Sequence, residues 1–144
     1  MFADPAPGST DIVGMPYGLD DNSASVLKSS TSRPHADLLA NTAHHVIISL
    51  SEVKFLLAEA YQRGILTGNA ETAYNEAVTA SMQYWGITDA AAIEGYLTAN
   101  AYDEANWKAS IGLQKWISLY TSGTEAWAEW RRLDQPVLTP SVNG

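Results

Sequence analysis

The stretch SEVKFLLAEAYQRG, residues 51–64, decides the fold of this chain. Ser49 and Glu52 have the spacing of a capping box, in which two side chains satisfy N–H groups of the first helical turn. Apolar residues then recur at helical spacing, and Gly64 suits the left-handed conformation in which many helices end. The apolar positions are Val53, Leu56, Leu57, Ala60 and Tyr61. The pattern predicts a helix that begins at Ser49 and ends at Gly64.

A second helix is predicted after the turn ILTGN, residues 65–69. Asn69 is its expected N-cap, and Gly86 is its stop signal. The apolar pattern consists of Ala73, Tyr74, Ala77, Val78, Met82 and Trp85. Two antiparallel helices joined by a glycine-containing turn resemble one tetratricopeptide-type hairpin. A single hairpin cannot bury both of its faces, so we expect neighbouring elements against it.

Three more helices are predicted in the C-terminal part. One covers residues 89–99 with Thr88 as its cap, and the next runs from Glu104 to Tyr120. Thr124 caps the last helix, and Pro136 prevents its continuation. The apolar positions of the first two are Ile93, Tyr96, Leu97, Trp107, Ile111, Trp116, Ile117 and Tyr120. These patterns predict an all-α fold, mostly helical with long loops, in which C-terminal helices accompany the hairpin.

The front of the chain has a different character. Residues 1–46 hold four of the six prolines and almost no apolar periodicity, which predicts loops with short strand pieces. A structureless stretch of this length is uncommon in a compact domain, so it either lies across a partner surface or is part of something larger. We therefore divide the chain into a loop-rich segment, 1–46, and a helical region, 47–144. We expect the two to form one domain that is a fragment of a larger protein.

Composition excludes several classes of function. The 144 residues carry a formal charge of −8, and an acidic surface disfavours general nucleic-acid binding. The sequence has no cysteine, which excludes a disulfide framework and thiolate metal sites. The N-terminus, MFADPAPGSTDIVGMPYG, lacks the pattern of a signal peptide, and no apolar run has the length of a membrane-spanning helix. As written, we expect this chain alone to be neither exported nor anchored.

The stretch TEAWAEWRRLDQP, residues 124–136, concentrates aromatic and charged side chains. On a helix Trp127 and Trp130 share a face, and Trp127 with Arg131 has the i,i+4 spacing of a cation–π pair. We expect the tryptophans to pack inward, so that this helix holds the C-terminus against the helix containing Trp116. A stacking site for a ligand and a nucleic-acid contact are the alternatives.

Catalytic and metal sites are not indicated. His44 and His45 point to opposite faces of an extended segment, and neither they nor His35 have a third ligand at a convincing spacing. No nucleophile elbow or phosphate loop is present. Carboxylates are many, but nothing singles out a pair for glycoside hydrolysis. We predict no enzyme, no cofactor and no metal.

Aromatic residues are the positive signal, with five tryptophans and seven tyrosines. Exposed rings stack on sugars, while nearby polar groups bind hydroxyls, and such rings also dominate protein interfaces. Most are expected in the core. Tyr17 lies in a glycine-rich loop and Trp107 beside the segment YDEAN, and neither fits the periodic pattern clearly. We take Tyr17, Trp107 and the neighbouring carboxylate Asp103 as candidate ligand-binding residues.

Four ordered motifs together resemble a known family. They are SEVKFLLAEAYQRG, YNEAVTASMQYWG, QKWISLY and GTEAWAEWRRLDQP, and the loop IVGMPYGL precedes them. The set is similar to the C-terminal part of SusD/RagB-like nutrient-binding lipoproteins of the outer membrane. The resemblance implies a helical, tetratricopeptide-like fold. It further implies a cell-surface lipoprotein of Bacteroidetes-type bacteria that captures oligosaccharides or peptides for a TonB-dependent transporter, without catalysis. Family members run to several hundred residues, so the resemblance also implies a fragment.

The sequence thus leaves three alternative functions. The first is a nutrient-binding subunit of a glycan-uptake complex, and the second is a tetratricopeptide-like scaffold that binds a protein partner and no sugar. The third is a piece of a glycoside hydrolase. A sugar ligand raises the melting temperature with its concentration, whereas a scaffold does not respond to it. The sequence does not name the glycan or peptide.

Overall fold

A computed structural model of the chain describes residues 3–140. The chain divides into two compact units: Val46–Leu138, and Met1–His45 with Thr139–Gly144. We call them the helical unit and the loop unit. Between residues 3 and 140, no helix has both the length and the apolar character needed to cross a membrane. The fold is mostly helical, as the sequence predicts.

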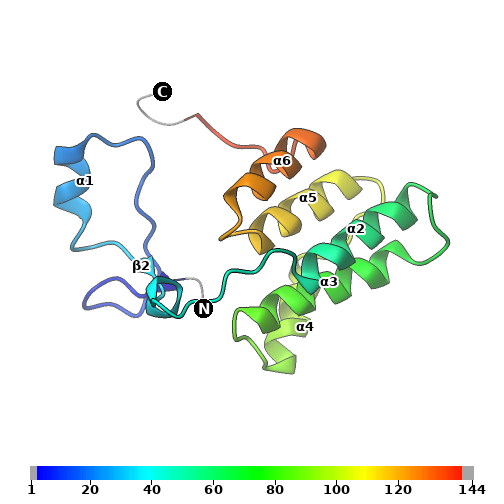
Figure 1. The fold of residues 1–144 in the computed structure, drawn as a ribbon, viewed down its shortest axis with the longest axis horizontal. Coiled ribbons are helices and arrows are strands. Elements are labelled where there is room, and N and C mark those ends of the chain that lie inside the picture. The colour runs from blue at the N-terminus through cyan, green and yellow to red at the C-terminus, as the bar shows by residue number, and fades with distance from the viewer. Residues whose placement is uncertain (1–2, 141–144) are drawn as a thin grey trace. The chain divides into compact units, whose positions relative to one another are not determined.

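The helical unit contains α2 (Leu50–Gln62), α3 (Ala70–Tyr84), α4 (Ala90–Ala99), α5 (Trp107–Ser118) and α6 (Gly123–Leu133). The α2–α3 hairpin is the most extensive packing, and α5 contacts both of its helices (Figure 1). The predicted hairpin is confirmed. Its neighbours within the chain are α4, which packs on α3, and α5, which also carries α6.

Helix boundaries follow from side chains that cap the first turns. The Ser49 hydroxyl accepts a hydrogen bond from the Glu52 amide, and the Asn69 side chain accepts one from Thr72, both at predicted caps. The prediction of Thr88 as a cap is wrong, because the carboxylate of the next residue, Asp89, accepts from the Ala92 amide.

The helix α5 begins at Trp107, later than the predicted Glu104. The Asp103 carboxylate accepts hydrogen bonds from the amides of Ala105 and Asn106, which holds these residues in a turn before the helix. The helix α6 begins one residue before the predicted cap, Thr124, and α5 has already ended at Ser118.

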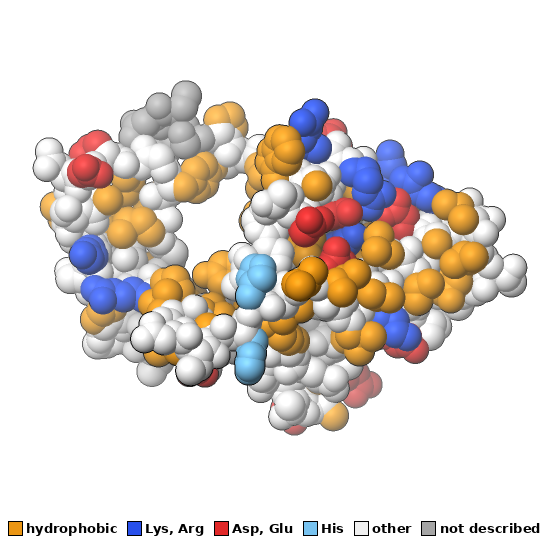
Figure 2. All heavy atoms as spheres, viewed as in Figure 1, with side chains coloured by type: hydrophobic (Ala, Val, Ile, Leu, Met, Phe, Trp, Pro, Cys, Tyr) orange, Lys and Arg blue, Asp and Glu red, His pale blue; other side chains and the backbone are white. Residues whose placement is uncertain are grey.

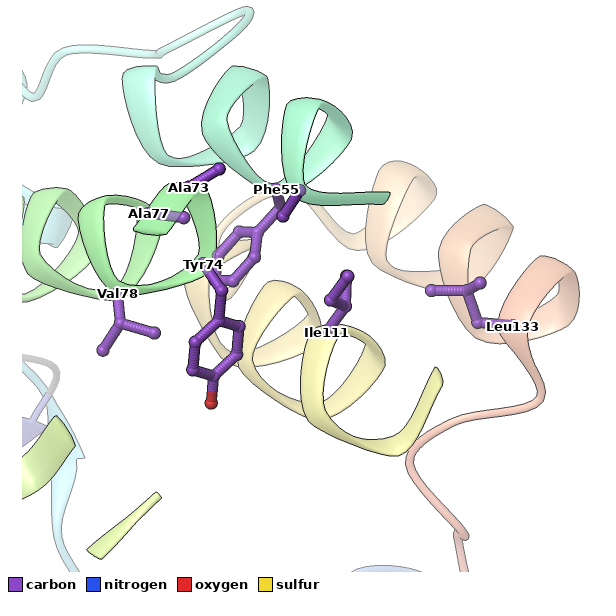
Figure 3. Packing of buried hydrophobic residues seen from close by; sticks show 8 residues of the cluster. Phe55, Ala73, Tyr74, Ala77, Val78, Ile111 and Leu133 are labelled. Atoms are coloured by element: carbon purple, nitrogen blue, oxygen red, sulfur yellow. The ribbon is translucent and has the colours of Figure 1, made fainter. Parts of the chain in front are cut away.

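The core of the helical unit lies between α2, α3, α5 and α6 (Figure 3). Phe55 is fully buried, and its ring meets Tyr74 edge-on at a centroid distance of 6.1 Å. The core residues are Phe55, Ala58, Ala73, Tyr74, Ala77, Val78, Ile111 and Leu133. Burial raises the pKa of Tyr74 to about 12, so the phenol stays neutral and donates to the Asn100 carbonyl oxygen.

The apolar stripe predicted for α2 is correct only in part, because Leu57 and Tyr61 pack against the core and two other members do not. Its buried residues are Ser51, Phe55, Ala58 and Glu59. Val53 and Leu56, which belong to the predicted stripe, are exposed. Hence α2 is apolar on two sides, and the pattern alone does not tell which side α3 and α5 cover.

The loop unit has short elements only. They are β1 (Ala3–Asp4), α1 (Asp21–Leu27), β2 (Arg33–Pro34) and a 3₁₀ turn (Ala36–Leu39). The antiparallel pair β1–β2 agrees with the predicted strand pieces. The helix α1 was not predicted, although the Asp20 side chain caps it by accepting from two amides. Among its described residues, Ala6 and Thr31 are buried.

Candidate functional site

The structure places Tyr17 in a hydrogen-bonding role within the loop unit. Its hydroxyl donates to the Thr139 carbonyl oxygen at 2.6 Å and contacts the Thr139 hydroxyl at 2.5 Å. The ring remains 57% exposed. Tyr17 therefore ties the front loop to the end of the chain through its hydroxyl, and only its ring face remains for a ligand.

Trp107 and Asp103 lie at the start of α5 and do not form an open platform. The Arg63 guanidinium carbon is 5.1 Å from the Trp107 ring centroid, and Lys108 Nζ is 5.9 Å from it. The Asp103 carboxylate is occupied by the amides that it caps and by the Asn106 side chain. These hydrogen bonds, that from the Asn106 side chain foremost, lower the pKa of Asp103. Both residues thus have structural contacts that the sequence did not indicate.

The C-terminal helix α6 turns its two tryptophans to different environments. Arg131 stacks on Trp127 at 4.8 Å, as the spacing predicts, but Trp127 is 56% exposed. The expectation that it packs inward is wrong. Trp130 is half-buried, and its Nε1 donates to the Pro136 carbonyl oxygen at 3.0 Å. Trp116 on α5 is more than a third exposed, so α6 is not held to α5 by an aromatic seam.

Ion pairs, rather than aromatic contacts, join α6 to α2 and α5. The Glu59 carboxylate on α2 accepts hydrogen bonds from both terminal nitrogens of Arg132 on α6. Glu129 on α6 lies 2.6 Å from Arg132 Nη2 and 3.0 Å from Nζ of Lys115 on α5. Arg63 Nε approaches Glu59 at 2.8 Å. Figure 2 shows red and blue side chains gathered over the region where Figure 1 places α2, α5 and α6.

This charge network controls the ionisation of its carboxyl groups. Burial by itself raises the pKa of Glu59 and of Glu129. The hydrogen bonds and positive charges of Arg132, with those of Lys115, outweigh it, so both pKa values lie below the ordinary value of 4.5. The two carboxylates are therefore charged at neutral pH and serve the joining of three helices.

A broad groove lies between α2 and α3, with a volume of about 450 Å³. It is lined by Leu50, Lys54, Thr72, Asn75, Glu76, Thr79, Ala80 and Gln83. The size is that of a small-molecule site, but no aromatic ring lines the groove. An ion pair between Lys54 and Glu76 at 2.6 Å joins its two helices. The groove has hydrogen-bonding groups and no stacking surface.

A second hollow, of about 20 Å³, lies where the starts of α2 and α6 meet the ends of α3 and α5. We call it the hydroxyl notch. It is lined by Val46, Ile47, Ser49, Ser51, Glu52, Tyr84, Ser118, Leu119, Thr121 and Ser122. Sequence reasoning missed this site. The available signal was the run SLYTSG, residues 118–123, whose hydroxyl groups stand at a helix end.

An aromatic cluster stands beside the hydroxyl notch. The rings of Tyr84 and Trp85 meet edge-on at 5.0 Å, and Tyr120 meets Trp85 at 5.8 Å. Trp85 is buried, whereas Tyr84 is 50% exposed and Tyr120 is exposed to a similar extent. The buried indole thus orients two tyrosine rings at the surface, one of which lines the notch.

The histidines do not gather into a metal site. His35 lies 3.6 Å from Asp4 and 3.4 Å from Asp37, distances of weak ion pairs. Across residues 3–140, no group of three or more histidine, aspartate or glutamate side chains has an arrangement that could hold a metal ion.

Comparison with known proteins identifies the family. The family described as SusD-like, "Starch-binding associating with outer membrane", matches residues 5–144. The chain belongs to this SusD-like family. A comparison with curated proteins gave no match. The sequence-based recognition of the family is thereby confirmed, and it rests on nearly the whole chain.

Two solved structures relate this SusD-like chain to longer proteins. One is a chitin-binding protein, 27% identical, with a TM-score of 0.85 over 96% of this chain and 34% of the other. The second is a SusD-like protein of Bacteroidetes, AC2a, 24% identical, with a TM-score of 0.70 over 96% of this chain and 31% of the other. This second match bears on the fold alone. The SusD-like chain spans about a third of the length of either structure.

Proposed function

We propose that this SusD-like chain is part of a non-enzymatic nutrient-binding protein that captures oligosaccharides at the outer membrane. The observation that carries the proposal is the family match over residues 5–144, together with the structural likeness to a chitin-binding protein. The whole protein would be a cell-surface lipoprotein, and its partner a TonB-dependent transporter that receives the glycan.

Four carboxylates of the chain are held in structural roles that do not suit a general acid. A glycoside hydrolase needs a carboxylic acid whose pKa is raised, so that it protonates the leaving group. Glu59 and Glu129 have lowered pKa values because arginine and lysine side chains surround them. Asp20 and Asp103 have lowered pKa values because they accept hydrogen bonds in caps. These four carboxylates act as structural acceptors, and none is poised as a general acid.

Thermal melting of the purified chain tests the proposal. Chitin and starch oligosaccharides are the first ligands to use, and short peptides are the alternative class. A ligand at about 100 times its Kd stabilises the folded state by about 2.7 kcal/mol, so the melting temperature rises with dose. A rise with one glycan class supports capture by residues of this chain. Unchanged melting with every glycan, checked by calorimetric titration, would contradict a role of these residues in binding.

A protein-binding scaffold is the second candidate, favoured by the uncovered apolar side of α2. Leu50, Val53 and Leu56 are exposed there. Such a surface is typical of protein contacts. Co-purification with a TonB-dependent transporter, in the presence and absence of glycan, separates the two candidates. A scaffold binds the transporter and shows no response to sugar, whereas the nutrient-binding protein responds to both.

A further inference from the structure

The hydroxyl notch and the ring beside it have the chemistry of a carbohydrate subsite. Sugars are bound by an aromatic ring that covers the apolar face of the pyranose and by polar groups that bind its hydroxyls. The notch offers polar groups from four helix ends: Thr121, the Glu52 carboxylate, and the hydroxyls of Ser51 and Ser118. The Ser51 hydroxyl is bonded to that of Ser49, and the Ser118 hydroxyl donates to the Lys115 carbonyl oxygen, so the Ser118 oxygen can only accept from a ligand. Tyr84, which lines the same hollow, supplies the aromatic ring.

We propose that the hydroxyl notch and Tyr84 form a subsite for one residue of a neutral oligosaccharide. The inference rests on the proposed function and gives it a location. The notch volume of about 20 Å³ admits one group the size of a water molecule or a hydroxyl. The sugar ring therefore stays outside, against the exposed ring of Tyr84, and directs a single substituent into the notch.

The charge of the site selects a neutral ligand. Glu52 lines the notch, and the chain carries a formal charge of −8, so a carboxylate or sulfate group on the ligand is repelled. Hydroxyl groups of a ligand suit this lining, because the Ser118 oxygen, whose proton goes to the Lys115 carbonyl, can still accept, and the Glu52 carboxylate accepts as well. A sugar hydroxyl in the notch can donate to the Glu52 carboxylate, which forms the stronger, charge-assisted type of hydrogen bond.

The other aromatic positions are less suited to this role. Trp107 has cations near its ring, and Trp127 has Arg131 stacked on it. The α2/α3 groove is lined by no aromatic side chain. Tyr84 alone among these candidates combines an exposed ring with a hollow lined by hydroxyls. The packing of Trp85 against Tyr84 at 5.0 Å holds the ring in place before a ligand arrives.

Four variants of the 144-residue chain test the subsite. The ligands are N,N′-diacetylchitobiose and maltose oligosaccharides, and the affinity is measured by calorimetric titration. Tyr84→Ala removes the ring, and Glu52→Gln removes the charged acceptor. Each is expected to weaken binding about tenfold, the loss that corresponds to one strong contact. Tyr84→Phe keeps the ring and is expected to change the affinity less than about threefold. Trp127→Ala is the matched control, because it removes an exposed ring outside the site.

Two results would overturn the subsite in different ways. If the parent chain binds a glycan and all four variants bind it equally well, the subsite is wrong and the proposed function stands. If the parent chain binds neither sugar, the proposed function of these residues fails together with the subsite. Chemical-shift changes in the unsubstituted chain locate the bound sugar even where a variant fails to fold. Shifts around residues 49–52, 84 and 118–122 support the proposal, and shifts confined elsewhere refute it.

Discussion

The replacement of Glu129 by alanine is expected to destabilise the helical unit severely. Glu129 neutralises Lys115, whose side chain is only 1% exposed, at a distance of 3.0 Å. Among the described residues, Glu129 is the acidic side chain in direct contact with the Lys115 ammonium, so this ion pair is what offsets its burial. Without the carboxylate, the ammonium must either stay buried without a partner or lose its proton.

The size of the effect follows from burial more than from distance. Removal of one partner of a buried ion pair costs about 3–5 kcal/mol. Lys54 and Glu76 form an even closer pair, at 2.6 Å, but their side chains are 31% and 51% exposed. Removal of an exposed pair costs about 0–1 kcal/mol. Glu76→Ala is therefore the matched control, with the same change of residue and a surface location.

Chemical denaturation at neutral pH and thermal melting measure both variants. For a unit of this size, a loss of 1 kcal/mol lowers the melting temperature by about 4–8 °C. Glu129→Ala is thus expected to lower it by at least about 12 °C, and Glu76→Ala by less than about 8 °C. The double variant Lys115→Met with Glu129→Ala is expected to recover much of the loss, because no charge then remains unpaired. Equal effects of Glu129→Ala and Glu76→Ala would refute the reasoning.

Three further predictions concern packing, pH and surface. Gly112→Ala is expected to lower the melting temperature, because the added Cβ would lie 2.5 Å from Cβ of Gln135. Gly95→Ala in α4 is the control: its Cβ meets nothing within 4 Å, so this variant is expected to be neutral or stabilising. The folded-state pKa values of Glu59 and Glu129 lie below their ordinary value of 4.5, so the stability they contribute is complete above that pH and is lost as the pH falls through the lowered values. Denaturation measured from pH 7 to pH 3 checks this, and Glu59→Gln is expected to flatten the profile. The isolated chain is expected to bind an apolar dye and to self-associate, which light scattering detects, and a dye-negative monomer would contradict this.

Local signals made much of the fold predictable. Serine or asparagine at a helix start and glycine at its end act within one turn, so the hairpin and its caps at Ser49 and Asn69 follow from the sequence. Which of two neighbouring side chains caps a helix start was not predictable in the same way. Asp89 caps α4 in place of Thr88, and Asp103 delays α5, because a carboxylate satisfies the amides better than the alternative at hand.

The candidate site was less predictable than the fold. Tyr17 and Trp107 were identified by their lack of periodicity, but their contacts come from residues far away in sequence, such as Thr139 and Arg63. The hydroxyl notch is built from four helix ends, and each contributes only ordinary serines, threonines and a tyrosine. Such a site has no local pattern, because its members meet only after the helices have packed. The sequence therefore indicates an aromatic surface without its location.

The orientation of α6 explains why its aromatic residues misled the prediction. At 100° per residue, Glu129 lies about 200° around the helix from Trp127, so the two cannot both face the core. Lys115 is fully buried on α5 and requires an anion, which turns Glu129, with Arg132 close to it, toward α5 and α2. Leu133 follows on the same side and enters the core. Trp127 therefore faces outward, where Arg131 stacks on it. The inward side of α6 thus carries Leu133, Trp130 and the carboxylate that pairs with the buried cation of α5, whereas the spacing of the tryptophans alone places Trp127 inside as well.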